Sequence, residues 1–356
     1  MRPPTLATDE EAGLRVTEVD RESRGMAPMG DDRTGHEDGG DRQARSFLRT
    51  IRHSEQLPLT AFLLVLCLVM LATSSVFGST QNVTNLGRQA SVLAVLAIAQ
   101  TFVILIGGID ISIGGTMAVT SVIAAQLTNE WGTVVPAFAV ALATALGVGM
   151  INGLLIAVMR LSPVVVTIAM WQALTGLSLV LSDGRPILPT EDGYYTLGSH
   201  DLGPIPLITV IAVSTLIAGG SLLRQTRFGR YVYATGGNET AAHLAGIATT
   251  RITFWCYTLC GLLSGLAGLL LSSRLGTANA SLGSAMVFSV FAAVFIGGVG
   301  WGGGKGTVTG VTLGVVLLTV ISNALDLHLV SSAWQQMITA AMIVVAVGVY
   351  RLRRQS

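Results

Sequence analysis

Residues 224–251 read RQTRFGRYVYATGGNETAAHLAGIATTR, a polar stretch enclosed by two long apolar runs. Its charge is mainly basic, from Arg224, Arg227, Arg230 and Arg251, against the single acid Glu239. Lys and Arg that flank membrane spans are retained on the cytoplasmic side. We therefore expect this stretch, called the polar segment below, to connect two spans on the cytoplasmic face.

The polar segment also predicts a short capped helix. Asn238 is suited to accept the free backbone N–H groups of a first helical turn, and Glu239 suits the positive end of the helix dipole. Gly246 follows after about two turns, where Gly commonly lets a chain leave a helix. Such a helix serves as a docking element for a cytosolic partner, or the segment is an ordinary basic loop. The residues alone leave both interpretations open.

The composition indicates an all-α, polytopic membrane protein. Of the 356 residues 51% are hydrophobic and only 12% are charged, and apolar runs of about 20 residues recur along the chain, which is the length of a membrane-spanning helix. The 42 Gly suit closely packed membrane helices. The runs predict ten spans, at about 57–77, 89–106, 113–127, 133–159, 163–181, 204–223, 252–273, 282–299, 307–325 and 334–350. The third is short enough to be re-entrant.

Ten spans place both termini in the cytoplasm, and the distribution of Arg agrees with this topology. Residues 1–56 are highly charged and have almost no apolar periodicity, which predicts a disordered cytosolic tail. Residues 57–350 are then the transmembrane domain, and 351–356 form a short cytosolic tail.

A glycine-rich break, GGIDISIGG at 107–115, follows the second predicted span. Asp110 is one of very few charges near membrane depth, which makes it a candidate functional residue, and glycine-interrupted apolar segments point to a transport path. Alternatively, Asp110 lies in a tight cytoplasmic turn and caps the next helix together with Ser112.

A second glycine-rich break, IGGVGWGGGKGTVTG at 296–310, resembles a phosphate-binding loop only superficially. The P-loop pattern requires Gly where Val299 stands and Ser or Thr where Gly306 follows Lys305. The chain therefore shows no nucleotide site of its own. The three Cys lie in apolar runs without nearby ligands, and the five His form no cluster, so neither a metal site nor catalysis is expected.

Three motifs carry a resemblance to the permeases of ribose-type bacterial sugar ABC importers, over roughly residues 57–350. RFGRYVYATGGNE at 227–239, followed by Ala242 and LAGI at 244–247, resembles the cytoplasmic coupling loop of that family, although His243 replaces the expected Arg or other polar residue. GGIDISIG at 107–114 resembles its Gly-Ile-Asp-Leu-Ser-x-Gly signature. The second glycine-rich break is similar to a third family motif that continues to Asn323.

The resemblance implies a permease subunit, in the bacterial plasma membrane, of an importer for a monosaccharide such as ribose, xylose or galactose. It implies three partners: a cytosolic ATPase that carries ATP and Mg, an external sugar-binding protein, and a second permease copy or a paralogue. The implied ATPase-coupling residues are Arg227, Gly229, Arg230, Gly236, Gly237, Asn238, Glu239, Ala242 and Gly246. The implied translocation-path residues are Gly107, Gly108, Asp110, Ser112, Gly114, Gly297, Gly298 and Asn323.

Two other functions remain open at this point: a stand-alone ion-coupled secondary transporter with Asp110 as its acid, and an ABC permease for a non-sugar polar solute. The external loop at 182–203 has a similar ambiguity. Its residues Tyr194, Tyr195, His200 and Asp201 contact a binding protein or belong to an ordinary solvated loop.

Overall fold

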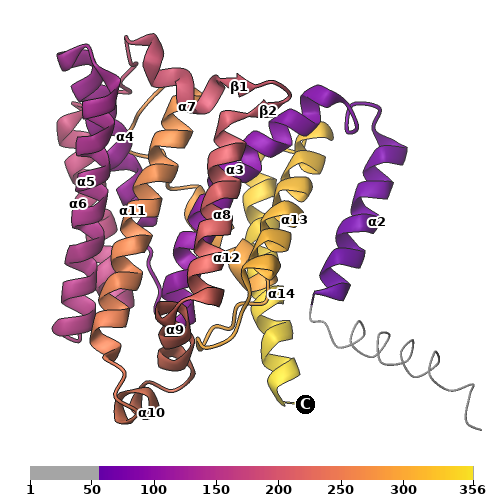
Figure 1. Cartoon of the computed structure of the whole chain (residues 1–356). Helices are drawn as coiled ribbons and strands as arrows, with labels where there is room; N and C mark the ends of the chain where they lie inside the picture. The colour runs from indigo at the N-terminus through magenta and orange to yellow at the C-terminus, as the bar shows by residue number, and fades with distance from the viewer. Residues whose placement is uncertain (1–55, 356) are drawn as a thin grey trace, which may run out of the picture. The chain divides into compact units, whose positions relative to one another are not determined.

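The structure, a computed structural model, describes residues 56–355 and is almost entirely helical there (Figure 1). The predicted cytosolic tail, residues 1–56, lies outside the described part apart from Gln56. The all-α class is confirmed, because the described strands are limited to one hairpin, β1 (Asp201–Leu202) paired antiparallel with β2 (Ile205–Pro206).

Ten of the described helices coincide with the ten predicted apolar segments. They are α2 (Leu57–Thr73), α3 (Thr80–Leu105), α4 (Ile113–Trp131), α5 (Val134–Gly153) with its π-helical continuation η1 (Leu154–Val158), α6 (Pro163–Leu181), α8 (Leu207–Gln225), α11 (Thr249–Leu275), α12 (Met286–Ile296), α13 (Val308–Leu327) and α14 (Ser332–Gln355). The other described helices are η2 (Asp192–Tyr195), α7 (Thr196–Ser199), α9 (Arg227–Gly237) and α10 (Glu239–Leu244).

Six helices in the described part are long and apolar enough to cross a membrane, namely α3, α5 with η1, α6, α8, α11 and α13. α12 has only 11 residues. At 1.5 Å per residue it covers about 16 Å, roughly half of the hydrocarbon core. The span predicted at 282–299 is therefore a short helix that reaches only part of the way across.

α4 is not among these six helices, although most of its residues are buried in the bundle. It packs against α5, α6 and α11, and its polar side chains Thr116, Thr120 and Ser121 are at most 1% exposed. Their hydroxyls donate to backbone carbonyls three or four residues earlier in the chain. Because protein rather than lipid surrounds α4, this helix does not need an uninterrupted apolar sequence.

Glycines allow α5 and α11 to pack backbone against backbone. A Cβ atom on Gly149 would lie 2.7 Å from the Tyr257 carbonyl oxygen, and one on Gly261 would lie 2.6 Å from the Cα of Gly149. Small residues at such crossings are the usual means by which membrane helices associate. By contrast, Val135 and Val180 on α5 and α6 are 81% and 74% exposed, as expected for a surface that faces lipid.

The two ends of the helical bundle differ. α9, α10 and the end of α14 lie at one end, whereas α7 and the hairpin β1–β2 lie at the other (Figure 1). α3 begins at Thr80 and not near residue 89, because the Ser79 side chain caps it by accepting from the Asn82 N–H at 3.2 Å. The polar residues 80–88 therefore extend the helix and do not form a loop.

Candidate functional site

The polar segment folds into two short helices. α10 is the helix that the sequence predicts: Asn238 Oδ1 accepts from the Ala241 N–H at 2.9 Å, and Gly246 leaves the helix with φ +83°. α9 is an addition that the sequence interpretation missed. Thr226 caps it by accepting from the Gly229 N–H at 3.2 Å, and Gly229, Val232 and Thr235 form its buried face.

α9 is attached to the bundle at a glycine contact. A Cβ atom on Gly236 would collide with the Leu105 carbonyl oxygen at the end of α3 and would lie 2.7 Å from the Gly304 nitrogen. The Gly304 N–H donates to the same Leu105 carbonyl at 2.8 Å, and the Tyr233 hydroxyl donates to the Gly306 carbonyl at 2.9 Å. The polar segment, the end of α3 just before the first glycine break, and the second glycine break therefore meet at one junction.

The first glycine break turns the chain back into the bundle. Gly107 has φ +79°, and the Gly108 N–H donates to the Val103 carbonyl at 2.9 Å. A side chain on Gly108 would collide with Tyr257, since its Cβ would lie 2.5 Å from the Tyr257 hydroxyl oxygen. The residues that follow therefore run inside the protein and not on its surface.

Asp110 lies in this inner stretch and is 1% exposed. Its Oδ1 accepts from the Ser112 N–H at 2.9 Å and from the Ser112 hydroxyl at 2.6 Å, directly before α4. The Asn152 side-chain amide donates to the Ser112 hydroxyl at 2.8 Å. Asp110 therefore forms a tight turn before α4, as the structural interpretation predicts. The turn is buried inside the protein, as the interpretation of Asp110 as a functional residue requires.

Two oxygens of this cluster lack a hydrogen-bond partner in the described part of the chain, Oδ2 of Asp110 and Oδ1 of Asn152. Gln100, which is also fully buried, faces the same turn. In the amide orientation that satisfies both groups, it accepts from the Asp110 N–H at 3.1 Å and donates to the Asp110 carbonyl at 3.2 Å. Buried polar groups of this kind hold one backbone geometry because breaking them is costly.

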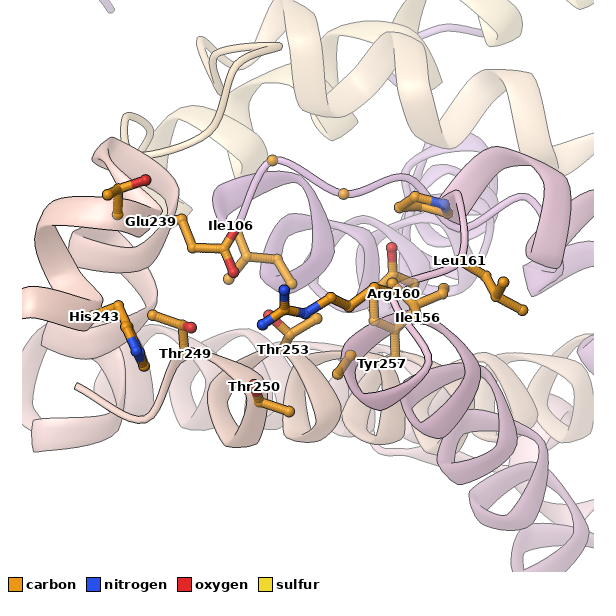
Figure 2. A pocket seen from close by; sticks show the side chains of 15 residues that line it. Ile106, Ile156, Arg160, Leu161, Glu239, His243, Thr249, Thr250, Thr253 and Tyr257 are labelled. Carbon is orange, nitrogen blue, oxygen red and sulfur yellow. The ribbon is translucent and has the colours of Figure 1, made fainter. Parts of the chain in front are cut away.

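A pocket of about 540 Å³ opens beside the junction (Figure 2). Gly107 and Gly108 of the first break line one side, and Glu239 and His243 of α10 line another. Arg160, which follows η1, extends into it (Figure 2). Residues predicted separately as path and as coupling residues therefore share one pocket.

The other predicted path residues lie elsewhere. Gly114 packs against Gly283, which precedes α12, and against Val287, which lies on α12. Gly297 packs against Gly310 on α13. Gly298, with φ +85°, lines a separate pocket of about 300 Å³. Asn323 lies near the C-terminal end of α13.

Asn323 forms a reciprocal pair with Asn82. The Asn323 amide donates to Asn82 Oδ1 at 2.8 Å, and the Asn82 amide donates to Asn323 Oδ1 at 3.1 Å. This pair joins α13 to the first turn of α3. The predicted path residues therefore lie at several separate places in the described part of the chain.

Comparison with known proteins gives the family. Residues 82–347, from the first turn of α3 into α14, match the family model described as "Branched-chain amino acid transport system / permease component". The chain belongs to this family of membrane permeases.

Several permeases named for sugars are similar to it over most of their length. The ribose import permease protein RbsC of Escherichia coli (strain K12) is 36% identical over 299 residues, 82% of this chain and 92% of the relative. RbsC of Bacillus subtilis (strain 168) is 39% identical over 293 residues, covering 81% and 90%. The L-arabinose ABC transporter permease protein AraH of Azospirillum brasilense is 31% identical over 291 residues, covering 81% and 86%. No solved structure gives a significant match.

At the opposite end of the permease, the residues of the loop at 182–203 have mainly structural contacts. Tyr194 is fully buried, and this burial raises the pKa of its hydroxyl to about 12; the hydroxyl pairs with Ser272 Oγ at 2.8 Å. Tyr195 donates to the Pro189 carbonyl at 2.7 Å. Asp201 accepts two hydrogen bonds from Arg88, at 2.7 and 2.8 Å. The suggestion that Tyr194 contacts a binding protein is therefore wrong, because its side chain is not at the surface.

Sequence reasoning missed three residues of the junction and its pocket, Arg160, Tyr233 and Tyr257, and also Asn152, which donates to Ser112 in the buried turn. They lie in different parts of the sequence, and only the folded chain shows their contacts. Within the described residues, no three His, Cys, Asp or Glu side chains lie close enough to hold a metal ion.

Proposed function

We propose that this permease is the membrane subunit of an ATP-driven ABC importer for a monosaccharide, in a bacterial plasma membrane with both termini in the cytoplasm. The observation that carries the proposal is the similarity to RbsC over about nine tenths of the relative's length, with 36% identity. AraH, a permease named for L-arabinose, is similar over nearly the same share of this chain. Two sugar names among the relatives favour a monosaccharide as the class and leave the particular sugar open.

The surface of α9 and α10 is the proposed docking site for the ATPase, which would carry ATP and Mg. Its coupling residues are those predicted from the sequence, from Arg227 to Gly246. Three features support this assignment. Arg227 and Arg230 are exposed charges on α9, Leu244 is an apolar side chain that is 82% exposed on α10, and the last turn of α9 is packed against the end of α3 and the second glycine break. A displacement of this surface would therefore be transmitted directly to α3 and to the start of α13.

The importer needs further partners to complete the path. A second permease copy or a paralogue would supply its other half, because the predicted path residues line no common cavity within one chain. A sugar-binding protein would deliver the solute at the end that carries α7 and the hairpin β1–β2. The ion-coupled alternative depends on Asp110, whose Oδ1 accepts two hydrogen bonds from Ser112 while its Oδ2 has no partner in the described part of the chain. Substitutions at Asp110 test this alternative.

The solute class is testable by uptake. A strain that lacks the gene would be complemented with the wild-type chain or with Gly236→Arg, and uptake of radiolabelled ribose, L-arabinose and leucine would be measured. We expect uptake of at least one sugar to be restored by the wild-type chain and not by Gly236→Arg. Restoration of leucine uptake alone would favour the amino-acid solute named in the family description.

A further inference from the structure

The pocket beside α10 carries two opposite charges that face each other without forming an ion pair. Arg160 and Glu239 point into it from different walls (Figure 2). No Arg160 nitrogen lies within 4.0 Å of a Glu239 carboxylate oxygen. Neither side chain has an ion-pair partner elsewhere in residues 56–355.

The wall that carries Arg160 has an unusual backbone. α5 ends in the π-helical turn η1, and Arg160 follows with φ +55°, a conformation that few residues other than Gly adopt. π-Helical turns are common at functional sites. This geometry turns the chain toward α6 and leaves the exposed Arg160 side chain at the pocket.

The opposite wall, formed by α10, has little buried surface. Ala242 is the buried residue of α10, whereas Glu239, Thr240 and His243 are exposed. An element with so little buried surface can shift at a small cost in packing. A small displacement of α10 toward η1 would narrow the pocket and shorten the distance between the two charges.

We propose that Arg160 is a further coupling residue, which pairs with Glu239 when α10 moves toward the end of α5. The ion pair then transmits the displacement of α10 to α5, beside the contacts that α9 makes with α3. This inference rests on the proposed function, because the docked ATPase is what moves α10.

The composition of the pocket supports this pairing. Besides Arg160 and Glu239, the titratable side chains that line it in the described part of the chain are His243 on α10 and Tyr257 on α11, so no second acid among these residues competes for the guanidinium. Attraction between opposite charges rises as they approach and as water leaves the space between them. The pair is therefore weak in the open pocket and strengthens as the pocket closes.

Spin labels across the pocket test the proposal. They would be attached at Leu161→Cys and Thr240→Cys, two exposed positions on the two walls. Cys67→Ser removes the partly exposed native thiol, whereas Cys256 and Cys260 are fully buried. The labelled permease is purified with its ATPase in lipid nanodiscs. The distance between the two labels is measured by double electron–electron resonance, without nucleotide and with Mg-ATP plus vanadate.

We expect nucleotide to produce a population with a shorter distance. Arg160→Glu should lower that population about fivefold, the upper range for an exposed ion pair, and Arg160→Gln should lower it less. Adding Glu239→Arg to Arg160→Glu should restore it. The matched control combines Glu239→Arg with Arg224→Glu. Arg224 is an exposed charge at the end of α8 that does not line the pocket, so this combination should not restore the short-distance population.

An unchanged distance in the wild-type complex, or a double reversal that fails to restore the short distance, would overturn the inference. Recovery of the ATPase with each variant is measured beforehand. This measurement distinguishes failure of the proposed function from failure of the role of Arg160. If the ATPase is bound and the distance does not shift, only the role of Arg160 is wrong. If no ATPase is recovered with the wild-type chain, the proposed function fails and this inference fails with it.

Discussion

The Tyr233 hydroxyl donates a 2.9 Å hydrogen bond to the carbonyl oxygen of Gly306, and this bond ties the polar segment to the second glycine break. Gly306 has φ +146° and begins the short extended stretch that leads into α13. Tyr233 therefore connects the proposed docking helix α9 to a membrane helix through one polar contact.

Tyr233→Phe removes this contact and keeps the ring. We expect it to cost about 1 kcal/mol of stability, the usual value of one hydrogen bond, and to lower sugar uptake while the chain remains inserted. Thermal unfolding in detergent and uptake measure the two effects. Tyr231→Phe is the matched control, because the Tyr231 side chain is 40% exposed and has no hydrogen bond in the described part. Equal effects of the two variants would contradict the role of Tyr233.

Gly236→Ala places a methyl group against the Leu105 carbonyl. The backbone has to move to accommodate it, so we expect a loss of about 1–3 kcal/mol, as for other overpacked sites, and weaker transport. Gly237→Ala tests the same chemistry one residue later, where a Cβ atom has no neighbour within 4 Å. Its stability should be unchanged or slightly higher, because Ala favours a helix over Gly.

Asp110→Asn and Asp110→Ala distinguish a structural carboxyl group from an ion-coupling one. Asn keeps an oxygen that accepts from Ser112, so we expect near-normal stability and uptake. Ala leaves the buried Ser112 N–H without its acceptor and should cost about 1–3 kcal/mol. Thermal unfolding and uptake would be measured for both. If Asn abolishes uptake as fully as Ala does, the charge itself is required, which would revive the ion-coupled alternative.

The Asn82–Asn323 pair predicts a coupling energy between α3 and α13. Each single change to Ala leaves a buried amide with lost partners, so the double change should cost less than the sum of the two single changes. We expect a coupling of about 0.5–3 kcal/mol, the range for residues in direct contact. A double-mutant cycle of unfolding free energies measures it, and additive costs would show that the pair contributes nothing.

Local rules predicted much of the fold. The apolar runs located the ten long or apolar helices because lipid demands such runs, and Asn238 and Gly246 marked the ends of α10 because capping depends on neighbouring residues only. α9 was missed because it ends in two glycines, which disfavour a helix interior. Its buried face, with Val232 at the centre, is stabilised by tertiary contacts that no local pattern reports.

The junction could not be predicted from patterns of neighbouring residues. Gly236 was named for its resemblance to a family motif, but its contact with Leu105 joins helices far apart in the sequence. Arg160 was not predicted as a site residue, since its position across the pocket from Glu239 depends on how α5 and α10 pack. Asn323 was named as a path residue by resemblance alone, and that role remains a prediction.

Docking of an ATPase on α9 and α10 is the central claim, and affinity co-purification from native membranes tests it most directly. Tagged wild-type chain would be compared with Leu244→Asp, which charges the exposed apolar side chain of α10, and with Leu329→Asp, which makes the same change at a 92% exposed residue between α13 and α14. We predict that a protein with a complete P-loop and Mg-dependent ATP hydrolysis is recovered with the wild type and Leu329→Asp, and lost with Leu244→Asp. Equal recovery with all three, or recovery of no ATPase with any of them, would contradict the account.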